Sequence, residues 1–309
     1  QTRVEAVKPF YERFMRELPN VAALAVCPEE KLLKLWEGLG YYNRVRNMQK
    51  AAQKIMEVYD GVFPADYEAL KGLPGIGNYT AGAVASIAFC IPVPAVDGNV
   101  LRVFSRLYND PGAITEPAVK RAFTARVMEH QPPEKAGDYN QALMELGALV
   151  CVPNGAPLCE QCPLVSLCEA RRAGTALELP HKAAPKARRI EPVTVVLAED
   201  AEERFLLQQR PQKGLLAGLW QPLLWEGEAL SAEEVCARLE ALGLACEGIE
   251  PLPAAKHIFS HIEWRMSGYS VCVGSAEAPA GCVWASREQL QNEYTLPGAF
   301  KAYKKKLGL

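Results

Sequence analysis

The chain contains 309 residues, of which 49% are hydrophobic and 23% carry a charge. This length suffices for about two domains, each with its own buried core, and no apolar run approaches the roughly 18 residues of a membrane span. We therefore expect a soluble protein with no membrane partner, and we exclude a small scaffold held together by disulfides. The formal net charge of −2 conceals a division, because residues 1–190 carry 23 basic and 20 acidic side chains, whereas residues 191–309 carry 11 and 16.

The first 172 residues show apolar side chains at helical spacing. Spacings of three and four predict one helix through Val4, Val7, Tyr11, Phe14 and Leu18, and another through Leu32, Leu35, Trp36 and Leu39. Asp66 is a predicted N-cap for a helix over residues 67–71, and residues 81–89 form a compact apolar helix. Because the connections are short and alternating runs are almost absent, we predict an all-α domain over residues 1–172.

The composition changes after residue 172. Residues 173–191 are rich in alanine, proline and basic side chains, which favours a solvated linker over a nucleic-acid contact. Beyond the linker, β-rich runs predict strands at residues 193–198 and 205–209, separated by a turn, and further strands around 258–273 and 282–285. Ser231 and Glu234 form a capping box for a helix whose predicted apolar face is Val235, Leu239 and Leu242. Residues 192–309 are therefore a predicted α+β domain.

The ten cysteines divide into two groups. We expect six scattered cysteines to be reduced and buried in a cytosolic protein: Cys27, Cys90, Cys236, Cys246, Cys272 and Cys282. The other four lie close together, with a C-x-x-C pair flanked by two outlying cysteines: Cys151, Cys159, Cys162 and Cys168. This spacing predicts a closed site of four thiolates, and by itself it fits zinc as well as an iron–sulfur cluster.

A glycine-containing turn joins two predicted helices at residues 70–82. Gly75 and Gly77 permit positive φ and leave the backbone uncovered, while the second helix presents free N–H groups. Such a turn suits a phosphate oxygen, although an ordinary helix corner fits the spacing equally well. The order Leu73-Pro74-Gly75-Ile76-Gly77 before an apolar helix closely resembles the helix–hairpin–helix of base-excision DNA glycosylases. The resemblance implies that this loop holds DNA phosphates without reading the base sequence.

A second signature of that superfamily follows at Val96-Asp97-Gly98-Asn99-Val100. Alone, an aspartate before a glycine is most often a helix cap or a turn residue. The resemblance implies instead that Asp97 is the carboxylate that stabilises, or briefly bonds, the deoxyribose cation as the base leaves. It also implies that Asn99 orients Asp97.

The resemblance also chooses between the two kinds of metal site. Endonuclease III and MutY-type glycosylases carry a [4Fe–4S] cluster at the end of the helical domain, which implies that Cys151, Cys159, Cys162 and Cys168 are its ligands. The gap between the first two cysteines is one residue longer than is usual in that family. This departure concerns the geometry of the loop rather than the identity of the ligands.

Tyr79 separates two branches of the superfamily. In endonuclease III-like enzymes this position holds the lysine that attacks the sugar, so a chain with Tyr79 cannot form a Schiff base there and resembles a monofunctional glycosylase. Residues 1–4, 38–47 and 140–147 resemble segments of MutY-type adenine DNA glycosylases. The resemblance implies that four residues wedge against the damaged base and its neighbours: Gln1, Thr2, Leu39 and Tyr41. It also implies that Gln141 reads the flipped adenine and that Tyr79 lines the sugar pocket. Without the resemblance, an aromatic such as Tyr41 in a helical context is more often a core residue.

The general acid of that family is a glutamate that would lie five residues before Gln1. Glu5, Glu12 and Glu37 are not evident substitutes for it. Protonation of the leaving adenine needs a correctly placed acid, so we expect a protein that truly began at Gln1 to be nearly inactive. We therefore expect an upstream segment to precede this chain.

The second domain resembles the Nudix hydrolases at residues 205–211 and 214–220. The metal-binding motif of those hydrolases can be aligned to this chain on Gly243. Cys236 and Ala237 then replace its Arg-Glu pair, and Glu240 and Ala241 replace its Glu-Glu pair. Because most of the carboxylates are missing, Mg²⁺ binding and pyrophosphate hydrolysis are disfavoured. MutY-type enzymes carry such a domain to recognise 8-oxoguanine. Their loop is similar to Phe259-Ser260-His261, which implies that Ser260 contacts the oxidised guanine. A hairpin turn with a capping serine is the alternative.

Together these features predict a multidomain protein, with an all-α helix–hairpin–helix glycosylase core that includes a [4Fe–4S] subdomain at residues 151–168, and a C-terminal α+β Nudix-like domain. The predicted reaction is hydrolysis of the N-glycosidic bond of adenine mispaired with 8-oxoguanine, on double-stranded DNA that contains this mispair. Base flipping is easiest at such a mispair. We expect a monomeric, bacterial-type cytoplasmic protein that associates with the nucleoid. The alternatives are a glycosylase for another mismatch such as T:G, a non-catalytic lesion-binding protein, and a Nudix nucleotide hydrolase.

Overall fold

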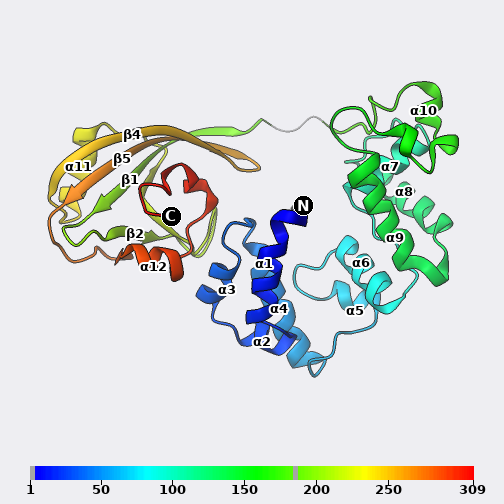
Figure 1. Ribbon diagram of the computed structural model, residues 1–309, viewed down its shortest axis with the longest axis horizontal. Coiled ribbons are helices and arrows are strands. Elements are labelled where there is room, and N and C mark those ends of the chain that lie inside the picture. Colours follow the sequence, from blue (N-terminus) through cyan, green and yellow to red (C-terminus); the bar gives the residue numbers. More distant parts are fainter. Residues whose placement is uncertain (1–3, 184–186) are drawn as a thin grey trace. The chain divides into compact units, whose positions relative to one another are not determined.

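The computed structural model of the chain describes residues 4–183 and 187–309. It contains two compact units, one formed by residues 1–49 with 186–309 and the other by residues 50–185 (Figure 1). The domain boundaries at residues 172 and 192 stay a prediction. Among the helices of the described ranges, none combines the length and the apolarity needed to cross a bilayer.

The first unit begins with four helices: α1 (Val4–Glu17), α2 (Val21–Val26), α3 (Glu29–Leu35) and α4 (Asn43–Val58), the last of which continues into the second unit. The two predicted helices are therefore confirmed. In α3 the apolar stripe is buried, with Leu32 and Leu35 in the core, whereas Leu39 follows the helix in a turn. Val4 and Tyr11 on the corresponding stripe of α1 are exposed.

The second unit is helical: α5 (Tyr67–Lys71), α6 (Asn78–Phe89), α7 (Gly98–Leu107), α8 (Pro117–His130), α9 (Ala136–Glu145) and α10 (Glu169–Ala173). Asp66 caps α5 as predicted, since its side chain accepts from the Ala69 N–H at 2.8 Å. One face of α7 is buried against α8 and α9, with Phe104 and Phe123 at the centre of this core. The buried face fixes α7, and with it the position of the residue that caps its first turn.

The rest of the first unit is a six-stranded sheet with two α-helices, α11 (Ala232–Ala241) and α12 (Arg287–Asn292), and a 3-10 helix at Gly298–Tyr303. Its strands are β1 (Arg189–Glu199), β2 (Phe205–Gln209), β3 (Trp220–Glu226), β4 (Cys246–Ile258), β5 (Ile262–Val273) and β6 (Cys282–Ala285). The strand order is β4-β5-β1-β3-β2-β6, and β1 and β5 are parallel. Alternate β1 side chains enter two cores, one around Trp264 and one beneath α11. This α+β arrangement confirms the predicted class of the second domain.

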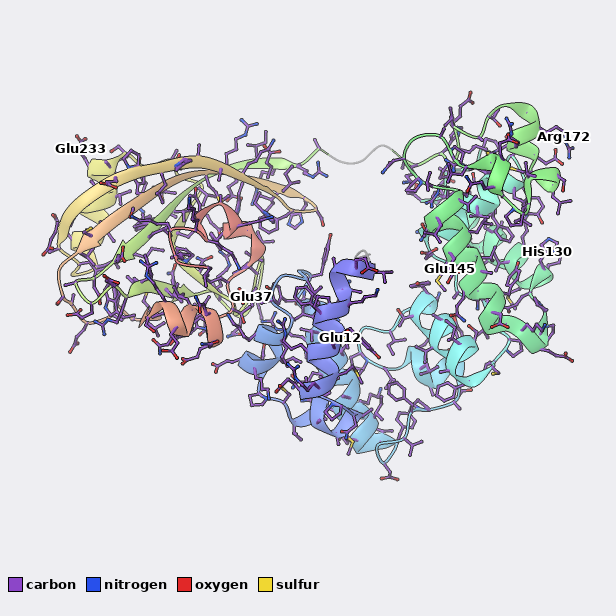
Figure 2. All side chains as sticks on the ribbon, viewed as in Figure 1. Glu12, Glu37, His130, Glu145, Arg172 and Glu233 are labelled. Carbon is purple, nitrogen blue, oxygen red and sulfur yellow. A yellow bond between two sulfur atoms is a disulfide. The ribbon has the colours of Figure 1, made fainter. Side chains whose placement is uncertain are left out.

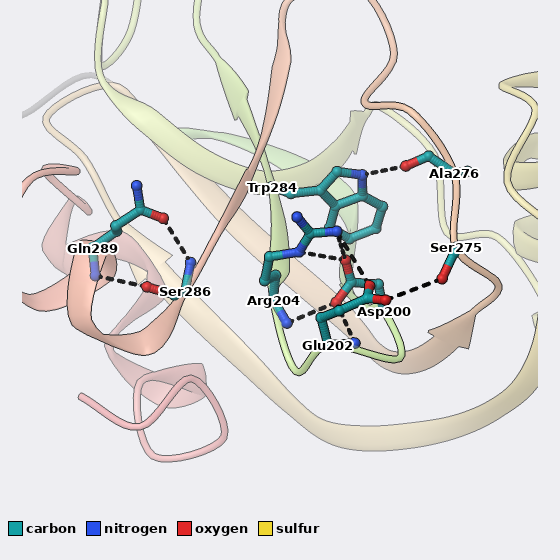
Figure 3. A network of polar contacts seen from close by, with 8 residues as sticks. All are labelled: Asp200, Glu202, Arg204, Ser275, Ala276, Trp284, Ser286 and Gln289. Atoms are coloured by element: carbon teal, nitrogen blue, oxygen red, sulfur yellow. Dashed lines mark hydrogen bonds and ion pairs between the residues drawn. The ribbon is translucent and has the colours of Figure 1, made fainter.

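The turn between β1 and β2 occurs at residues 200–204, where the sequence predicts one (Figure 3). The buried Asp200 carboxylate accepts from the backbone N–H of Glu202 at 3.1 Å and from that of Arg204 at 2.8 Å. Arg204 also donates to it from the guanidinium, which lies over the ring of Trp284. Although burial raises the pKa of Asp200, the contacts with Arg204 lower it overall.

Two predictions about side-chain placement are wrong. Leu242 follows the end of α11 and is 42% exposed, because the helix stops one residue earlier and the chain turns at Gly243. The six scattered cysteines are not all reduced and buried. The same reversal after α11 brings Cys236 and Cys246 together in a disulfide, whereas Cys90 and Cys272 are exposed. Cys27 is buried as predicted.

Candidate active site

Asp97 caps the first turn of α7, and both of its carboxylate oxygens are held. Oδ1 accepts from the backbone N–H of Asn99 at 2.8 Å and of Val100 at 2.9 Å, and Oδ2 accepts from Asn99 Nδ2 at 2.9 Å. The half-buried carboxylate thus lies at the positive end of the helix. The helix-cap interpretation and the catalytic one are compatible, because the cap fixes the orientation of the carboxylate.

The orientation of Asn99 is fixed in turn by Arg102, whose side chain is buried. Arg102 Nη2 donates to Asn99 Oδ1 at 2.9 Å and to the Gly147 carbonyl at 2.7 Å, and Nε donates to the Cys151 carbonyl at 2.8 Å. Burial lowers the pKa of Arg102. Gly147 permits this packing, since a Cβ there would lie 2.6 Å from Asn99 Cβ. Asn99 therefore presents its amide N–H to Asp97, while its role in orienting that residue for catalysis stays a prediction.

Asn140 on α9 is a supporting residue that the sequence analysis missed. Its fully buried side chain donates to the Val93 carbonyl at 2.9 Å and to Ser86 Oγ at 2.8 Å, and accepts from the Ala95 N–H at 3.1 Å. Gly82 on α6 contacts the same strand-like segment, and a Cβ there would overlap the Pro94 carbonyl oxygen. Segment 93–95 is therefore clamped between α6 and α9 immediately before Asp97. The one signal in the sequence was an asparagine on an apolar helix.

Tyr79, in the first turn of α6, lies with its hydroxyl 3.2 Å from Met144 Sδ on α9. Burial, and then the negative charge of Asp97, raise the pKa of Tyr79, which keeps the phenol neutral. Gln141 on α9 is exposed, and its Nε2 donates to the Gly137 carbonyl at 3.3 Å. Residues from α6, α7 and α9 thus converge in one unit, although their positions in the sequence span more than sixty residues.

The turn between α5 and α6 joins two helices as the sequence predicts, but only one of its two glycines has a positive φ. Gly75 has a φ of 75°, whereas Gly77 has a φ of −95°, which any residue can adopt. Gly77 caps α6 without a side chain, and a Cβ there would meet no atom of residues 4–183 and 187–309 within 4 Å. The glycine at position 77 is therefore not required by the backbone conformation, and it leaves the N–H groups of α6 open to a ligand.

The predicted wedge residues lie in the first unit, apart from Gln1 and Thr2, which fall outside the described residues. Leu39 is half-buried and Tyr41 is 69% exposed, in the turn between α3 and α4. Trp36 Nε1 donates to the Gly40 carbonyl at 3.0 Å, and the Arg44 guanidinium lies 5.1 Å from the Tyr41 ring centroid. Tyr41 is thus not a core residue.

Phe259, Ser260 and His261 form the tip of the β4–β5 hairpin. The Phe259 N–H donates to the Ile262 carbonyl at 2.8 Å, and the Phe259 ring packs edge-on against Trp264 and His257. Ser260 and His261 are exposed. The aromatic contacts anchor the tip, so that these two side chains extend from a rigid base.

The four clustered cysteines line a single cavity in the second unit: Cys151, Cys159, Cys162 and Cys168. Arg106 also lines it, and its Nη1 lies 3.3 Å from Cys151 Sγ. Burial raises the pKa of Cys162. Within the described part of the chain, no group of three or more His, Cys, Asp or Glu side chains has the geometry to hold a metal ion. The donor set of four thiols beside a buried arginine nevertheless suits an anionic group with thiolate ligands.

Two of the three acidic residues considered as substitute general acids, Glu5 and Glu37, have other partners. Glu37, which is labelled in Figure 2, forms ion pairs with Lys34 at 2.7 Å and Lys304 at 3.3 Å. Glu5 pairs with Lys8 at 2.7 Å. In α11, Glu234 completes the capping box with Ser231, and Cys236 is in the disulfide. One position of the degenerate metal-binding motif, Cys236, thus has a structural role.

Two protein families match this chain. Residues 1–129 match the HhH-GPD superfamily of base excision DNA repair proteins, and residues 194–306 match the NUDIX domain. The fold and the site therefore define a base excision repair protein of the helix–hairpin–helix class with an added NUDIX domain.

The most similar relatives include adenine DNA glycosylases from three organisms. The sequence is 35% identical to that of Mus musculus and 34% identical to that of Homo sapiens, each over 94% of this chain, and it spans 66% and 63% of their lengths. It is 30% identical to that of Buchnera aphidicola subsp. Baizongia pistaciae, over 85% of this chain and 73% of that protein. The chain belongs to the adenine DNA glycosylase family. A solved endonuclease III–DNA complex is 29% identical over 55% of this chain and 78% of that chain, with a TM-score of 0.48.

Proposed function

We propose that the protein hydrolyses the N-glycosidic bond of adenine opposite 8-oxoguanine and leaves the DNA strand intact. The observation that carries this proposal is the Asp97 carboxylate, with both oxygens oriented, at the start of α7. As the bond breaks, its electron pair leaves with adenine, and Asp97 stabilises the positive charge that develops on the deoxyribose. Water then adds to the sugar carbon and gives up one proton, which balances the proton that adenine takes up as it leaves. The family resemblance implies that a glutamate acts as the general acid that protonates adenine.

The remaining side chains would prepare the base for this step. Adenine must leave the duplex to reach Asp97. Gln141 would bind the flipped adenine, because its exposed amide offers both a donor and an acceptor. Leu39 and Tyr41, with Gln1 and Thr2, would fill the space that opens in the stack. Tyr79 would line the sugar pocket with a neutral phenol and no amine, so that the strand is not cleaved through a Schiff base.

The test uses the full-length protein with duplexes that carry A:8-oxoguanine or T:G. We expect the protein to release adenine from the A:8-oxoguanine duplex and to release no thymine from the T:G duplex. Thymine release at an equal rate would identify the glycosylase as one for another mismatch. Tight lesion binding without any base release would identify a lesion-binding protein.

The α5–α6 hairpin would hold a DNA phosphate. We expect Gly77→Ala to weaken duplex binding several-fold while the free energy of unfolding changes by less than about 1 kcal/mol, since the methyl group has room in the free protein but would meet the phosphate. Fluorescence anisotropy with a labelled duplex measures the binding, and chemical denaturation measures the stability. If the affinity for the duplex did not change, the hairpin would not be part of the DNA interface.

The β4–β5 hairpin would recognise the oxidised guanine through Ser260. We expect Ser260→Ala to lower the preference for A:8-oxoguanine over A:G by about tenfold, the worth of one specific hydrogen bond. Parallel single-turnover measurements on the two duplexes give this ratio. Because Ser260 is exposed at the tip, the melting temperature should not change. If the ratio of the two rates equalled that of the unmodified protein, Ser260 would be a turn residue that does not recognise the oxidised guanine.

The four cysteines would hold a [4Fe–4S] cluster: Cys151, Cys159, Cys162 and Cys168. We expect protein purified without oxygen to absorb near 400 nm, as thiolate-bound iron–sulfur clusters do at about this wavelength. Cys162→Ser should reduce this absorption and the iron content, whereas Cys27→Ser, which changes a buried cysteine in the other unit, should not. If the purified protein contained stoichiometric zinc and no iron, the four cysteines would be a zinc site and not a cluster site.

A further inference from the structure

A loop of the NUDIX domain completes the core of the N-terminal helices. The loop comprises residues 214–219, and its Leu219 is fully buried among Leu32, Leu35 and Val45 of α3 and α4. Leu216 packs against the same core. Arg46 of α4 adds a polar contact, because its Nη2 donates to the Ala217 carbonyl at 2.7 Å. The helices that lead into and out of the turn with Leu39 and Tyr41 are therefore packed directly on the NUDIX domain.

Three charged side chains make a second attachment, which we call the Lys34–Glu37–Lys304 cluster. Lys34 Nζ lies 2.7 Å from Glu37 Oε2 and donates to the carbonyls of Leu290 and Tyr294, both at 3.0 Å. Glu37 Oε1 faces Lys304 Nζ at 3.3 Å. The side chains of Lys34 and Glu37 are 18% and 15% exposed, so water screens their interaction less than it screens a surface pair.

Residues 36–42, which we call the wedge loop, are held by these attachments at both ends. Glu37 lies near one end, and the buried Tyr42, followed by Arg46, lies at the other. Between them, the Trp36 side chain donates to the Gly40 carbonyl and closes the loop. The exposed Tyr41 is consequently presented by a loop whose two supports belong partly to the NUDIX domain.

We propose that the Lys34–Glu37–Lys304 cluster is a positioning device that couples the NUDIX domain to the wedge loop. Binding of the oxidised guanine by the NUDIX domain then holds the wedge loop against the mispair and favours extrusion of adenine. This inference rests on the proposed function, which supplies the DNA contacts of the wedge loop and of Ser260, both of which belong to one compact unit. Lys304, from the last segment of the chain, becomes a residue that affects excision without contacting adenine.

The experiment compares Lys304→Met in the full-length protein with Lys305→Met, which removes the same charge from an exposed neighbour. Three quantities are measured: the affinity for an A:8-oxoguanine duplex, the single-turnover rate of adenine release, and the fluorescence of 2-aminopurine placed opposite 8-oxoguanine, which increases as that base unstacks. We expect Lys304→Met to lower the rate about tenfold and to reduce the fluorescence increase, with affinity within about twofold, since small errors in positioning are costly. Lys305→Met should match the unmodified protein.

Glu37→Gln should show a defect at least as large, because Glu37 contacts Lys34 as well as Lys304 and its Oε1 also accepts from the Leu296 N–H at 3.3 Å. The double variant should be no worse than Glu37→Gln alone, since the Lys304–Glu37 interaction is already lost in that single variant. Lys304→Arg should restore much of the rate. The proposal is overturned if Lys304→Met releases adenine and unstacks 2-aminopurine normally, or if affinity and rate fall together by the same factor. A failure of the unmodified protein to release adenine would instead contradict the proposed function, and the fluorescence comparison would still test the coupling.

Discussion

Asp97→Asn is expected to abolish adenine release while the protein still binds the duplex. The amide has the same shape and caps a helix as well as aspartate does, so α7 should remain folded. It lacks the negative charge that stabilises the sugar cation, and loss of such a group costs on the order of 10³-fold in rate. The amide N–H₂ would also face the N–H₂ of Asn99, which cannot rotate without losing its hydrogen bond from Arg102.

The measurement is single-turnover release of adenine from an A:8-oxoguanine duplex, with affinity measured in parallel. Asp66→Asn is the matched control, because Asp66 caps α5 in the same way, through the Ala69 N–H. The control should release adenine at nearly the rate of the unmodified protein. If Asp97→Asn released adenine at a rate within tenfold of that of the unmodified protein, another carboxylate would have to stabilise the sugar cation.

Gly82→Ala is expected to be the most disruptive small change in the second unit. A methyl group at this position would overlap the Pro94 carbonyl oxygen, and backbone cannot move aside as a flexible side chain can. Segment 93–95 is also held by Asn140, so relief of the overlap must displace α6 or break those hydrogen bonds. We expect a loss of about 1–3 kcal/mol in the free energy of unfolding, or more, together with a large loss of adenine release.

Chemical denaturation measures this loss, with Gly98→Ala as the control for stability. Gly98 is exposed in the first turn of α7, and an added Cβ there meets no atom within 4 Å in the described part of the protein. The control should unfold at nearly the same denaturant concentration as the unmodified protein. Equal stability of both variants would mean that the packing of α6 against segment 93–95 is loose.

Local patterns predicted much of this protein correctly. The capping box at Ser231, the cap at Asp66 and the strands at residues 193–198 and 205–209 depend on neighbours within a few residues, and the structure confirms them. The hairpin at residues 73–77 and the signature around Asp97 were recognisable for the same reason. Errors arose at the end of α11, where the helix stops before Leu242 and the chain reverses, and this same reversal pairs Cys236 with Cys246, ten residues further along.

The order of residues is enough to identify the chemical groups that the chain can offer: an aspartate at a helix start, a tyrosine where an amine would attack the sugar, and four clustered thiols. How those groups are held depends on contacts between elements that are far apart in the sequence. Arg102 and Asn140 act on the site through hydrogen bonds to residues up to 49 positions away. Lys34 supports the wedge loop through a hydrogen bond to the Leu290 carbonyl, which lies 256 positions away in the sequence. Periodicity reports which face of an element is buried, but the partner on that face is chosen by the packing of the whole unit.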